Sequence, residues 1–421
     1  MASDRIGRRG VLGSGLALGA AALAPRALGG CDQGDAPRGA PAPLAQDGVV
    51  VARIPDDGRF YYMHDPGMAC MPDGAIVVAA PCLERPTRTS FAVASWRTFV
   101  ARSTDRGRTF QPMPTLPYSD GSPFVHDGRL YMFVQPEKWR DVSIVRSDDL
   151  GATWTPPSRL FAGAYWNADA PVVLDRGRLL WAVHTRDYQG GVVVLAADPA
   201  RDLLDPATWR MSSEAVRPTT PAALLPPGKD GKGDWWLEPN VVVVRGKVRV
   251  ILRTILGDYA TSGLAAFCDL TDEPGRFALD FTQLHPMACG QCKVYVVWDE
   301  PSGLFWMLGN LPADTQERVF DWRAVREGGF LGGGGNDRRF LVLSYSVDAM
   351  SWFTAGVVAR TQNLHQSYMY PSADIDGPDL VLVSRTSRNG RDQHDADTVT
   401  FHRVRDFRSL AMDLRHTEAR T

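Results

Sequence analysis

Ser103-Thr-Asp105-Arg-Gly107-Arg-Thr109-Phe110 is repeated further along the chain as Ser147-Asp-Asp149-Leu-Gly151-Ala-Thr153-Trp154. Both stretches fit Ser-x-Asp-x-Gly-x-Thr-aromatic, and Ser346-Val-Asp348-Ala-Met-Ser-Trp352 is a degenerate third copy. In such a stretch the Asp and Ser/Thr side chains hydrogen-bond backbone amides of a tight turn. The glycine supplies a positive φ, and the aromatic ring anchors the turn. Because each copy follows a strand-like run, the repeat predicts β-hairpins and has a structural rather than a chemical meaning.

A second repeat counts the structural units. Six turns, each followed by an apolar strand-like run, recur at intervals of roughly 50 to 75 residues, the spacing of propeller blades with variable loops. They lie at Pro72-Asp-Gly, His126-Asp-Gly, Asp175-Arg-Gly, Arg245-Gly, Pro301-Ser-Gly and Ile375-Asp-Gly. Long amphipathic helices are not apparent after the N-terminus. The sequence therefore predicts an all-β, six-bladed β-propeller.

The first repeat resembles the Asp-box, or BNR repeat, of sialidase-like β-propellers, and the resemblance extends over nearly everything from about residue 60. It implies a propeller over residues 48–415, with an active site at one end of the central channel. In such a fold the site is built from loops at the start of the inner strands. We expect the ring of blades to close by pairing of residues 49–54 with residues 398–404.

The N-terminus has the features of an export signal. Arg8-Arg9 precedes an apolar stretch, Val11–Ala24, that is too short and too weakly hydrophobic for a typical membrane span, and it resembles a twin-arginine signal. Leu28-Gly-Gly-Cys31 resembles a lipobox, which implies lipidation of Cys31; a plain signal peptide with an incidental cysteine is the alternative. We expect residues 1–30 to be a signal and residues 31–47 a flexible tether. The protein would then be periplasmic or at the cell surface, touching the membrane through its lipid anchor.

Composition narrows the range of partners. The formal net charge is −2 and long basic runs are lacking, so nucleic-acid binding has no support. The 12 Trp and 11 Tyr residues suit blade packing first and sugar stacking second. We expect a monomer that binds carbohydrate and needs no cofactor. Cys289 and Cys292 could form a local disulfide or stay as buried thiols, and Cys70 could pair with Cys82 in an oxidising compartment.

Glu238 and Arg253 are the first candidate site residues. They lie on either side of one predicted hairpin, in Trp236-Leu-Glu238-Pro-Asn240 and in the strand that follows. This arrangement resembles a sialidase segment in which the Glu deprotonates a Tyr nucleophile and the Arg binds the substrate carboxylate. A structural salt bridge below the channel is the alternative for Glu238.

The resemblance also implies an arginine before the third Asp-box and a tyrosine before the last turn. Arg338 fits the arginine position best and Arg339 is second, because adjacent strand residues point to opposite faces. Tyr370 is preferred over Tyr368 as nucleophile, which leaves Tyr368 as a candidate substrate-binding residue. The alternative for Tyr370 is packing between blades.

Two expected features are altered. Where sialidases carry Arg-Ile-Pro before the first turn, this chain has His64-Asp65-Pro66, and Arg53-Ile-Pro lies too far upstream. The loop expected to hold the acid/base Asp, residues 80–86, has Glu84 as its only carboxylate. We therefore take His64, Asp65 and Glu84 as candidate catalytic groups.

The stretch Gln393-His-Asp-Ala-Asp397, with Arg385-Thr-Ser before it, resembles the last blade of a bacterial sialidase-like subgroup. His394 and Asp395 are candidate substrate-binding residues there, although they could instead cap a turn. A metal site from His394, Asp395 and Asp397 is disfavoured, because three ligands so close in sequence rarely converge.

Three functions are compatible with these residues. The first is an exo-acting, retaining glycoside hydrolase on a polar or acidic sugar, with Tyr370 as nucleophile and Glu238 as its base. Arg253 and Arg338 would bind an anionic group, and Glu84 or Asp65 would serve as acid/base. The second is a polysaccharide lyase on a uronate-containing glycan, with His64 as base. The third is a sugar-binding propeller without catalysis.

Overall fold

The computed structural model describes residues 41–88, 90, 92–185, 190–225, 234–256, 263–313, 337–390 and 392–414. The predicted signal peptide, Cys31 and most of the predicted tether lie outside these residues. Within them, no helix has the length and apolar character needed to cross a membrane.

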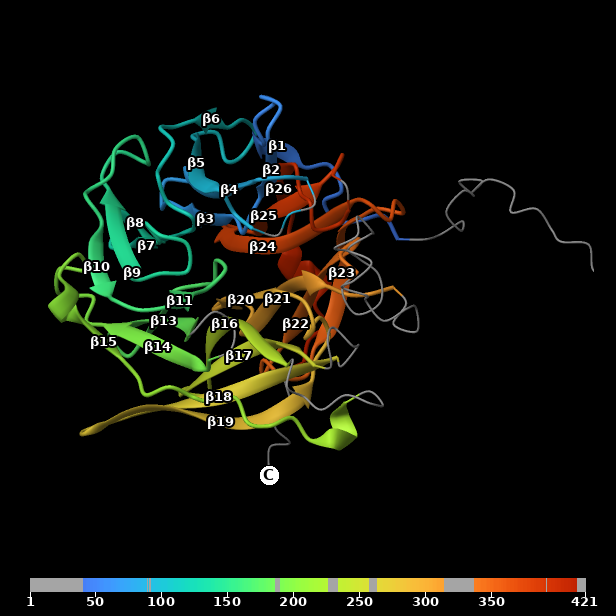
Figure 1. Ribbon diagram of the computed structural model, residues 1–421. Helices are drawn as coiled ribbons and strands as arrows, with labels where there is room; N and C mark the ends of the chain where they lie inside the picture. The colour runs from blue at the N-terminus through green and yellow to red at the C-terminus, as the bar shows by residue number, and fades with distance from the viewer. Residues whose placement is uncertain are drawn as a thin grey trace, which may run out of the picture. The chain divides into compact units, whose positions relative to one another are not determined.

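Residues from Pro43 onward form one compact unit of six antiparallel sheets, which Figure 1 shows arranged around a common centre. Blade 1 has the order β2-β4-β5-β6 with β3 beside β4, and its strands are β2 (Phe60–Met63), β3 (Gly67–Cys70), β4 (Ile76–Arg85), β5 (Ser95–Ser103) and β6 (Gln111–Pro112). Blade 2 comprises β7 (Gly121–His126), β8 (Arg129–Val134), β9 (Val142–Ser147) and β10 (Ser158–Phe161). Blade 3 comprises β11 (Tyr165–Trp166), β12 (Val173–Asp175), β13 (Arg178–Thr185), β14 (Val192–Ala197) and β15 (Trp209–Met211).

The remaining blades follow the same plan. Blade 4 comprises β16 (Trp235–Val244), β17 (Lys247–Ile255), β18 (Leu264–Glu273) and β19 (Arg276–Pro286). Blade 5 comprises β20 (Val294–Asp299), β21 (Leu304–Asn310), β22 (Phe340–Ser346) and β23 (Phe353–Arg360). Blade 6 comprises β24 (Ser367–Asp376), β25 (Asp379–Ser387), β26 (Thr398–Val404) and β1 (Val49–Arg53). Short 3-10 turns are η1 (Pro206–Thr208), η2 (Ala222–Leu224) and η4 (Phe407–Leu410). The predicted six-bladed propeller is confirmed.

The ring closes as the sequence predicts. β1 pairs antiparallel with β26, with Val49 opposite Phe401 and Arg53 opposite Thr398. The final residues of the predicted tether also belong to the compact unit, which corrects the expected boundary at residue 48. The amides of Leu44 and Ala45 donate to carbonyls of β23, and Leu44 fits against Gly356, where a Cβ would crowd it.

Both repeats have the local structure that their residues predict. In the first Asp-box, Asp105 Oδ1 accepts from Thr109 N at 2.9 Å, and Ser103 Oγ accepts from Gly107 N at 2.8 Å. The second copy repeats these contacts at 2.8 Å each, and in the third Asp348 Oδ1 accepts from Met350 N and Ser351 N. The glycines of all six turns of the second repeat adopt positive φ: Gly74, Gly128, Gly177, Gly246, Gly303 and Gly377.

The two disulfides considered from the sequence are absent, since all five described cysteines are free thiols. Cys70 lies opposite Ile76 at one end of β4, whereas Cys82 lies opposite Met63 towards the other end, so the register of the sheet separates them. Cys289 and Cys292 are both buried, as the thiol alternative predicts.

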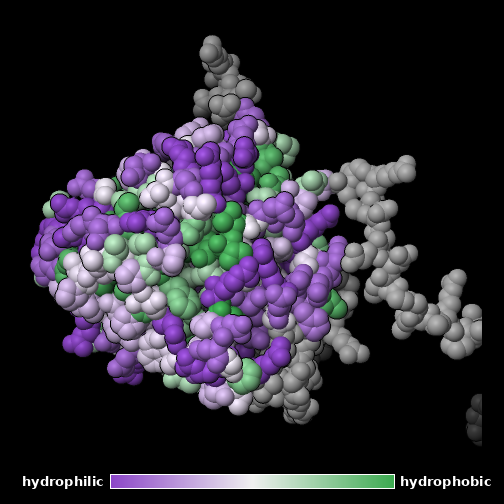
Figure 2. Space-filling view, turned by 90° about the horizontal axis from the view of Figure 1, so that it is seen from above, coloured by the Kyte–Doolittle hydropathy of each residue, from purple (hydrophilic) through white to green (hydrophobic). Residues whose placement is uncertain are grey.

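The blades pack through apolar clusters between neighbouring sheets, and hydrophilic side chains cover most of the face shown in Figure 2. The later halves of the inner strands of all six blades line a cavity of about 720 Å³. The beginnings of the same strands carry the ionisable residues described next.

Candidate active site

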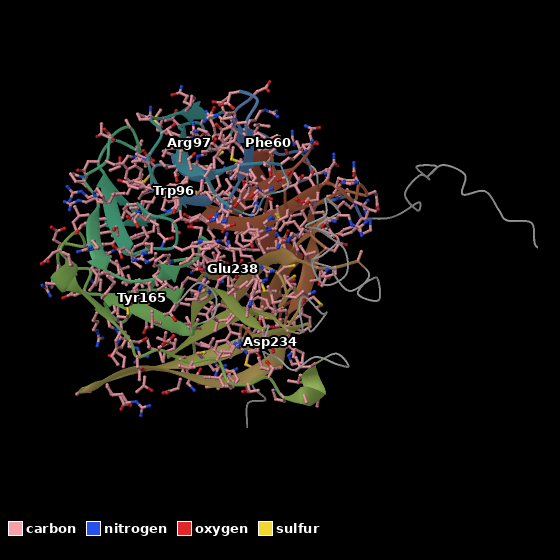
Figure 3. All side chains as sticks on the ribbon, viewed as in Figure 1. Phe60, Trp96, Arg97, Tyr165, Asp234 and Glu238 are labelled. Carbon is pink, nitrogen blue, oxygen red and sulfur yellow. The ribbon has the colours of Figure 1, made fainter. Side chains whose placement is uncertain are left out.

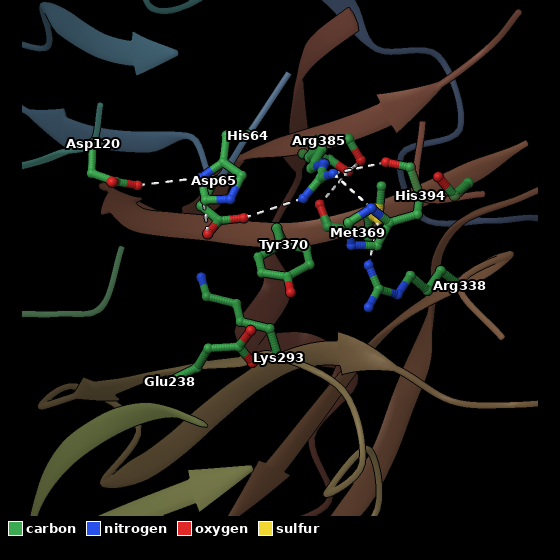
Figure 4. Close-up of polar contacts among 12 residues, drawn as sticks. His64, Asp65, Asp120, Glu238, Lys293, Arg338, Met369, Tyr370, Arg385 and His394 are labelled. Atoms are coloured by element: carbon green, nitrogen blue, oxygen red, sulfur yellow. Dashed lines mark hydrogen bonds and ion pairs between the residues drawn. The ribbon is translucent and has the colours of Figure 1, made fainter. Parts of the chain in front are cut away.

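Each of the six blades contributes one ionisable residue from the first half of its inner strand or from the four residues before that strand. These residues, here called the channel ring, are Asp65, Asp120, Asp169, Glu238, Lys293 and Tyr370. All six are buried, and five of them appear together in Figure 4. Figure 3 shows Glu238 near the middle of the blades. Buried charges need partners, so the contacts of the ring identify what this end of the channel can do.

Glu238 and Tyr370 share an unusual backbone. Both have positive φ, 53° and 50°, and both precede a proline in an inner strand. The strand register shifts at the same places, between Leu237 and Asn240 in β16 and between Met369 and Ser372 in β24. Such β-bulges redirect a side chain, and strained backbone of this kind is concentrated at functional sites.

Arg253 joins these two residues. Its Nη1 donates to Glu238 Oε1 at 3.1 Å and Oε2 at 3.2 Å, and to the Tyr370 hydroxyl at 3.3 Å. Its Nε donates to the Gln291 carbonyl at 2.7 Å. No direct hydrogen bond joins Glu238 to Tyr370 in the described chain, so the contact expected between them runs through Arg253. Burial, followed by the Glu238 charge, raises the pKa of Tyr370, and the hydroxyl stays protonated until a base acts on it.

Two further guanidinium groups lie over the Tyr370 ring. The Cζ atoms of Arg338 and Arg385 are each 5.2 Å from its centroid, within cation–π range. Sequence reasoning placed Arg253 and Arg338 in the site but missed Arg385. The sequence feature that could have identified Arg385 is a charged residue directly after the largely apolar run Leu380-Val-Leu-Val-Ser384 on β25. In the structure Arg385 is 1% exposed.

Arg385 leads to a second polar cluster, formed by His64, Asp65 and Asp120. Arg385 Nη1 donates to Asp65 Oδ1 at 3.4 Å, and His64 Nδ1 lies 3.4 Å from Asp65 Oδ2 and 3.2 Å from Asp120 Oδ1. Burial raises the pKa of Asp65, raises that of Asp120 to about 7, and lowers that of His64 to about 3. At neutral pH the imidazole is therefore uncharged and lies between two carboxyl groups that retain protons readily.

The same cluster bears on metal binding. The ligand atoms of His64, Asp65 and Asp120 lie within 4.8 Å of one another, a spacing that one metal ion could bridge. However, Arg385 already pairs with Asp65. The charge of Lys138 also favours ionised Asp120 and so opposes the burial that raises the pKa of this residue. Positive charge is thus supplied by the protein, and acid/base chemistry fits this cluster better than metal chemistry.

Asp120 was missed from the sequence because the Ser119-Asp-Gly121 stretch belongs to neither repeat. Its carboxylate accepts from Trp166 Nε1 at 3.3 Å and from Ser119 Oγ at 3.0 Å. Asp65, by contrast, has an oxygen, Oδ2, that accepts no hydrogen bond within the residues described.

Three predicted site residues lie elsewhere. Glu84, which lies opposite Tyr61 of β2, instead binds Arg59 at 3.3 Å and Ser95 at 2.6 Å. Arg339, which follows Arg338 just before β22, pairs with Asp337 at 2.8 Å. The Tyr368 hydroxyl accepts from Gln46 Nε2 at 3.1 Å, and its ring packs against His402, because the bulge after Met369 turns Tyr370 alone towards the channel.

His394 and Asp395 support arginines. The His394 carbonyl accepts from Arg385 Nη2 at 2.7 Å, and Asp395 Oδ1 accepts from Arg85 Nη1 at 2.8 Å. Asp397 accepts instead from the Arg388 amide at 2.7 Å, so these three residues do not form the metal site weighed from the sequence. Burial lowers the pKa of His394 well below its ordinary value, which keeps it neutral beside Arg385.

Neither a protein-family model nor a curated protein matches this sequence. Among solved structures, a Dyadobacter fermentans protein of unknown function aligns with a TM-score of 0.55 and 15% identity, over 85% of this chain and 97% of that one. Penicillium chrysogenum α-L-arabinanase, complexed with arabinobiose, aligns with a TM-score of 0.51 and 14% identity, over 86% and 99%. Trypanosoma rangeli sialidase, as a covalent intermediate with 2,3-difluorosialic acid, aligns with a TM-score of 0.54 and 16% identity, over 88% of this chain and 59% of that one. The chain has the sialidase-like six-bladed propeller fold.

Proposed function

We propose that this protein is a retaining glycoside hydrolase acting on a polar or acidic sugar. The observation that carries the proposal is the contact of one buried nitrogen, Arg253 Nη1, with both the Glu238 carboxylate and the Tyr370 hydroxyl. A purely structural ion pair would not need a tyrosine in strained backbone beside it. The fold shared with a sialidase and an arabinanase supports the same class of reaction.

In the proposed first step, the Tyr370 oxygen forms a bond to the anomeric carbon and its proton passes to Glu238. The bond to the leaving oxygen breaks as Asp65 donates a proton to that oxygen. In the second step Asp65 takes a proton from water, the water oxygen bonds to the anomeric carbon, and the bond to Tyr370 breaks as Glu238 returns its proton. A phenol of raised pKa needs a base to take this proton, and Glu238 and Tyr370 contact the same nitrogen, Arg253 Nη1.

The acid/base role falls to Asp65 rather than Glu84. Burial raises the pKa of Asp65, as general acids require, and its Oδ2 accepts no hydrogen bond in the described chain, although His64 Nδ1 lies 3.4 Å away. Arg338 and Arg385, on the Tyr370 ring, supply the charge for an anionic group of the sugar. The export signal expected in residues 1–30 would place this reaction outside the cytoplasm.

Tyr370→Phe tests the proposal. We expect kcat to fall by at least about a hundredfold with folding intact, because one hydroxyl is removed. Tyr368→Phe is the matched control and should stay active, since its hydroxyl contacts Gln46. The measurements are turnover of a glycoside panel that includes sialosides and uronides, NMR of the released anomer, and mass spectrometry of a fluorosugar adduct.

Two other results would assign the site differently. A product that absorbs in the ultraviolet, without a fluorosugar adduct, would indicate a lyase in which neutral His64 is the base. Sugar binding without turnover across the panel would indicate a binding module.

A further inference from the structure

The bulges at Glu238 and Tyr370 each leave a carbonyl outside the strand ladder, and each carbonyl is taken up by a side chain of the preceding blade. The Pro239 carbonyl accepts from Asn167 Nδ2 at 3.0 Å, and the Pro371 carbonyl accepts from Lys293 Nζ. Asn167 follows β11 in blade 3, and Lys293 precedes β20 in blade 5. We call these two contacts the carbonyl clamps.

The two clamps differ in charge. A neutral amide suffices at Pro239, whereas the clamp at Pro371 is an ammonium group on a residue that is 2% exposed. Burying a charge is costly unless it is compensated, so Lys293 provides more than a hydrogen bond. Burial lowers its pKa, while the carboxylates of Asp169, Asp65 and Glu238 raise it.

The surroundings of Lys293 show what that charge acts on. The titratable groups around it are the three carboxyl groups just named and Tyr295, whose ring centroid is 4.7 Å from Nζ. Figure 4 shows the Lys293 side chain beside Glu238 and Tyr370. The charge of Lys293 interacts favourably with the carboxylates of Glu238 and Asp65. The proposed reaction needs Glu238 ionised before attack and Asp65 ionised after it has donated its proton.

We propose that Lys293 is a positioning residue of the reaction. It fixes the orientation of the Tyr370 side chain through its hydrogen bond to the Pro371 carbonyl, and it places a positive charge among the carboxylates of the channel ring. The inference rests on the proposed function, because it assigns Lys293 through its effect on Tyr370, Glu238 and Asp65. A solely structural Lys293–Asp169 ion pair is the competing interpretation.

Lys293→Gln and Lys293→Arg separate charge from structure. We expect Lys293→Gln to lower kcat by about tenfold or more with little change in KM, and to move the acid limb of the kcat/KM profile upward by about half a pH unit. The arginine variant should return that limb towards the wild-type position. Asn167→Ala is the matched control, because it removes the neutral clamp: kcat should fall while the limb stays in place.

Two results would overturn the inference. One is a Lys293→Gln enzyme with wild-type kcat and pH profile. The other is equal impairment of the Gln and Arg variants without movement of the limb, which would leave only the structural ion pair. If Lys293→Gln does not fold, Lys293→Met keeps the length of the side chain without its charge and should show the same shift; an unchanged profile there also overturns the inference.

Failure of the proposed function remains distinguishable. A fully active Tyr370→Phe enzyme would refute the nucleophile assignment whatever Lys293 does. The clamp itself is then tested by comparing the positions of Tyr370 and Pro371 in crystal structures of Lys293→Gln and the wild type. Displacement of Tyr370 and Pro371 supports the clamp, and an unmoved Tyr370 overturns it.

Discussion

At the scale of single residues, Asp120 gives a direct test of the site's electrostatics. Burial raises its pKa from 3.8 to about 7, so the folded protein binds this proton more tightly than the unfolded chain does. The resulting stability is fully present below pH 3.8 and is lost as the pH rises through about 7.

Asp120→Asn removes this titration. Relative to wild type, the variant should gain unfolding free energy as the pH rises from 4 to 8, by at most about 4 kcal/mol. Urea unfolding at a series of pH values measures this difference. Asp148→Asn, at a carboxylate paired with Arg146 on the surface, is the control for loss of a charge. A pH-independent difference between Asp120→Asn and wild type would contradict the assigned pKa.

Site residues could be predicted from the sequence where a local motif, such as one hairpin, links them. Glu238 and Arg253 were predicted together because one hairpin links them, and the structure brings them into contact. Arg385 and Asp120 come from stretches outside both repeats, so their approach depends on closure of the ring. Glu84 contacts Arg59 and Ser95 rather than the other site residues, and these partners are not apparent from the loop composition.

At the scale of the structural element, the Asp-box turns were predictable because their hydrogen bonds are local. The bulges were not predicted, although each follows from a non-glycine residue held at positive φ before a proline. Their clamps come from another blade, so no local pattern encodes them. The boundary near residue 43 was missed for a similar reason, since Leu44 is held by β23.

A pair of glycine substitutions tests how the Asp-box is anchored. Gly107 and Gly128 both have positive φ, which costs an alanine about 1–2 kcal/mol at either site. A Cβ at Gly107 would also clash with the buried ring of Phe401, whereas a Cβ at Gly128 meets nothing within 4 Å. Gly107→Ala should therefore lower the unfolding free energy by about 1–3 kcal/mol more than Gly128→Ala. Equal losses in urea unfolding would show that the box packs more loosely against β26.

At the scale of the whole molecule, the β1–β26 pairing is what closes the propeller. A chain that begins at residue 55 lacks β1 and leaves the edge of β26 unpaired. We expect it to be much less stable than a chain that begins at residue 41 and to associate through the exposed edge. Chemical unfolding and light scattering of the two chains give the comparison. Equal stability of both chains would mean that the other interfaces between blades suffice for closure.

The channel ring has a further consequence for how the protein is made. Its six members are spread from Asp65 to Tyr370, one in each blade. Strand β26, which pairs with β1 to close the ring, is synthesised after all of them. A chain still on the ribosome therefore lacks a complete channel ring, and its early carboxylates stay in water until the late blades cover them. We therefore expect the proposed activity only from a chain whose synthesis and ring closure are complete, and not from a proteolytic fragment that lacks a blade.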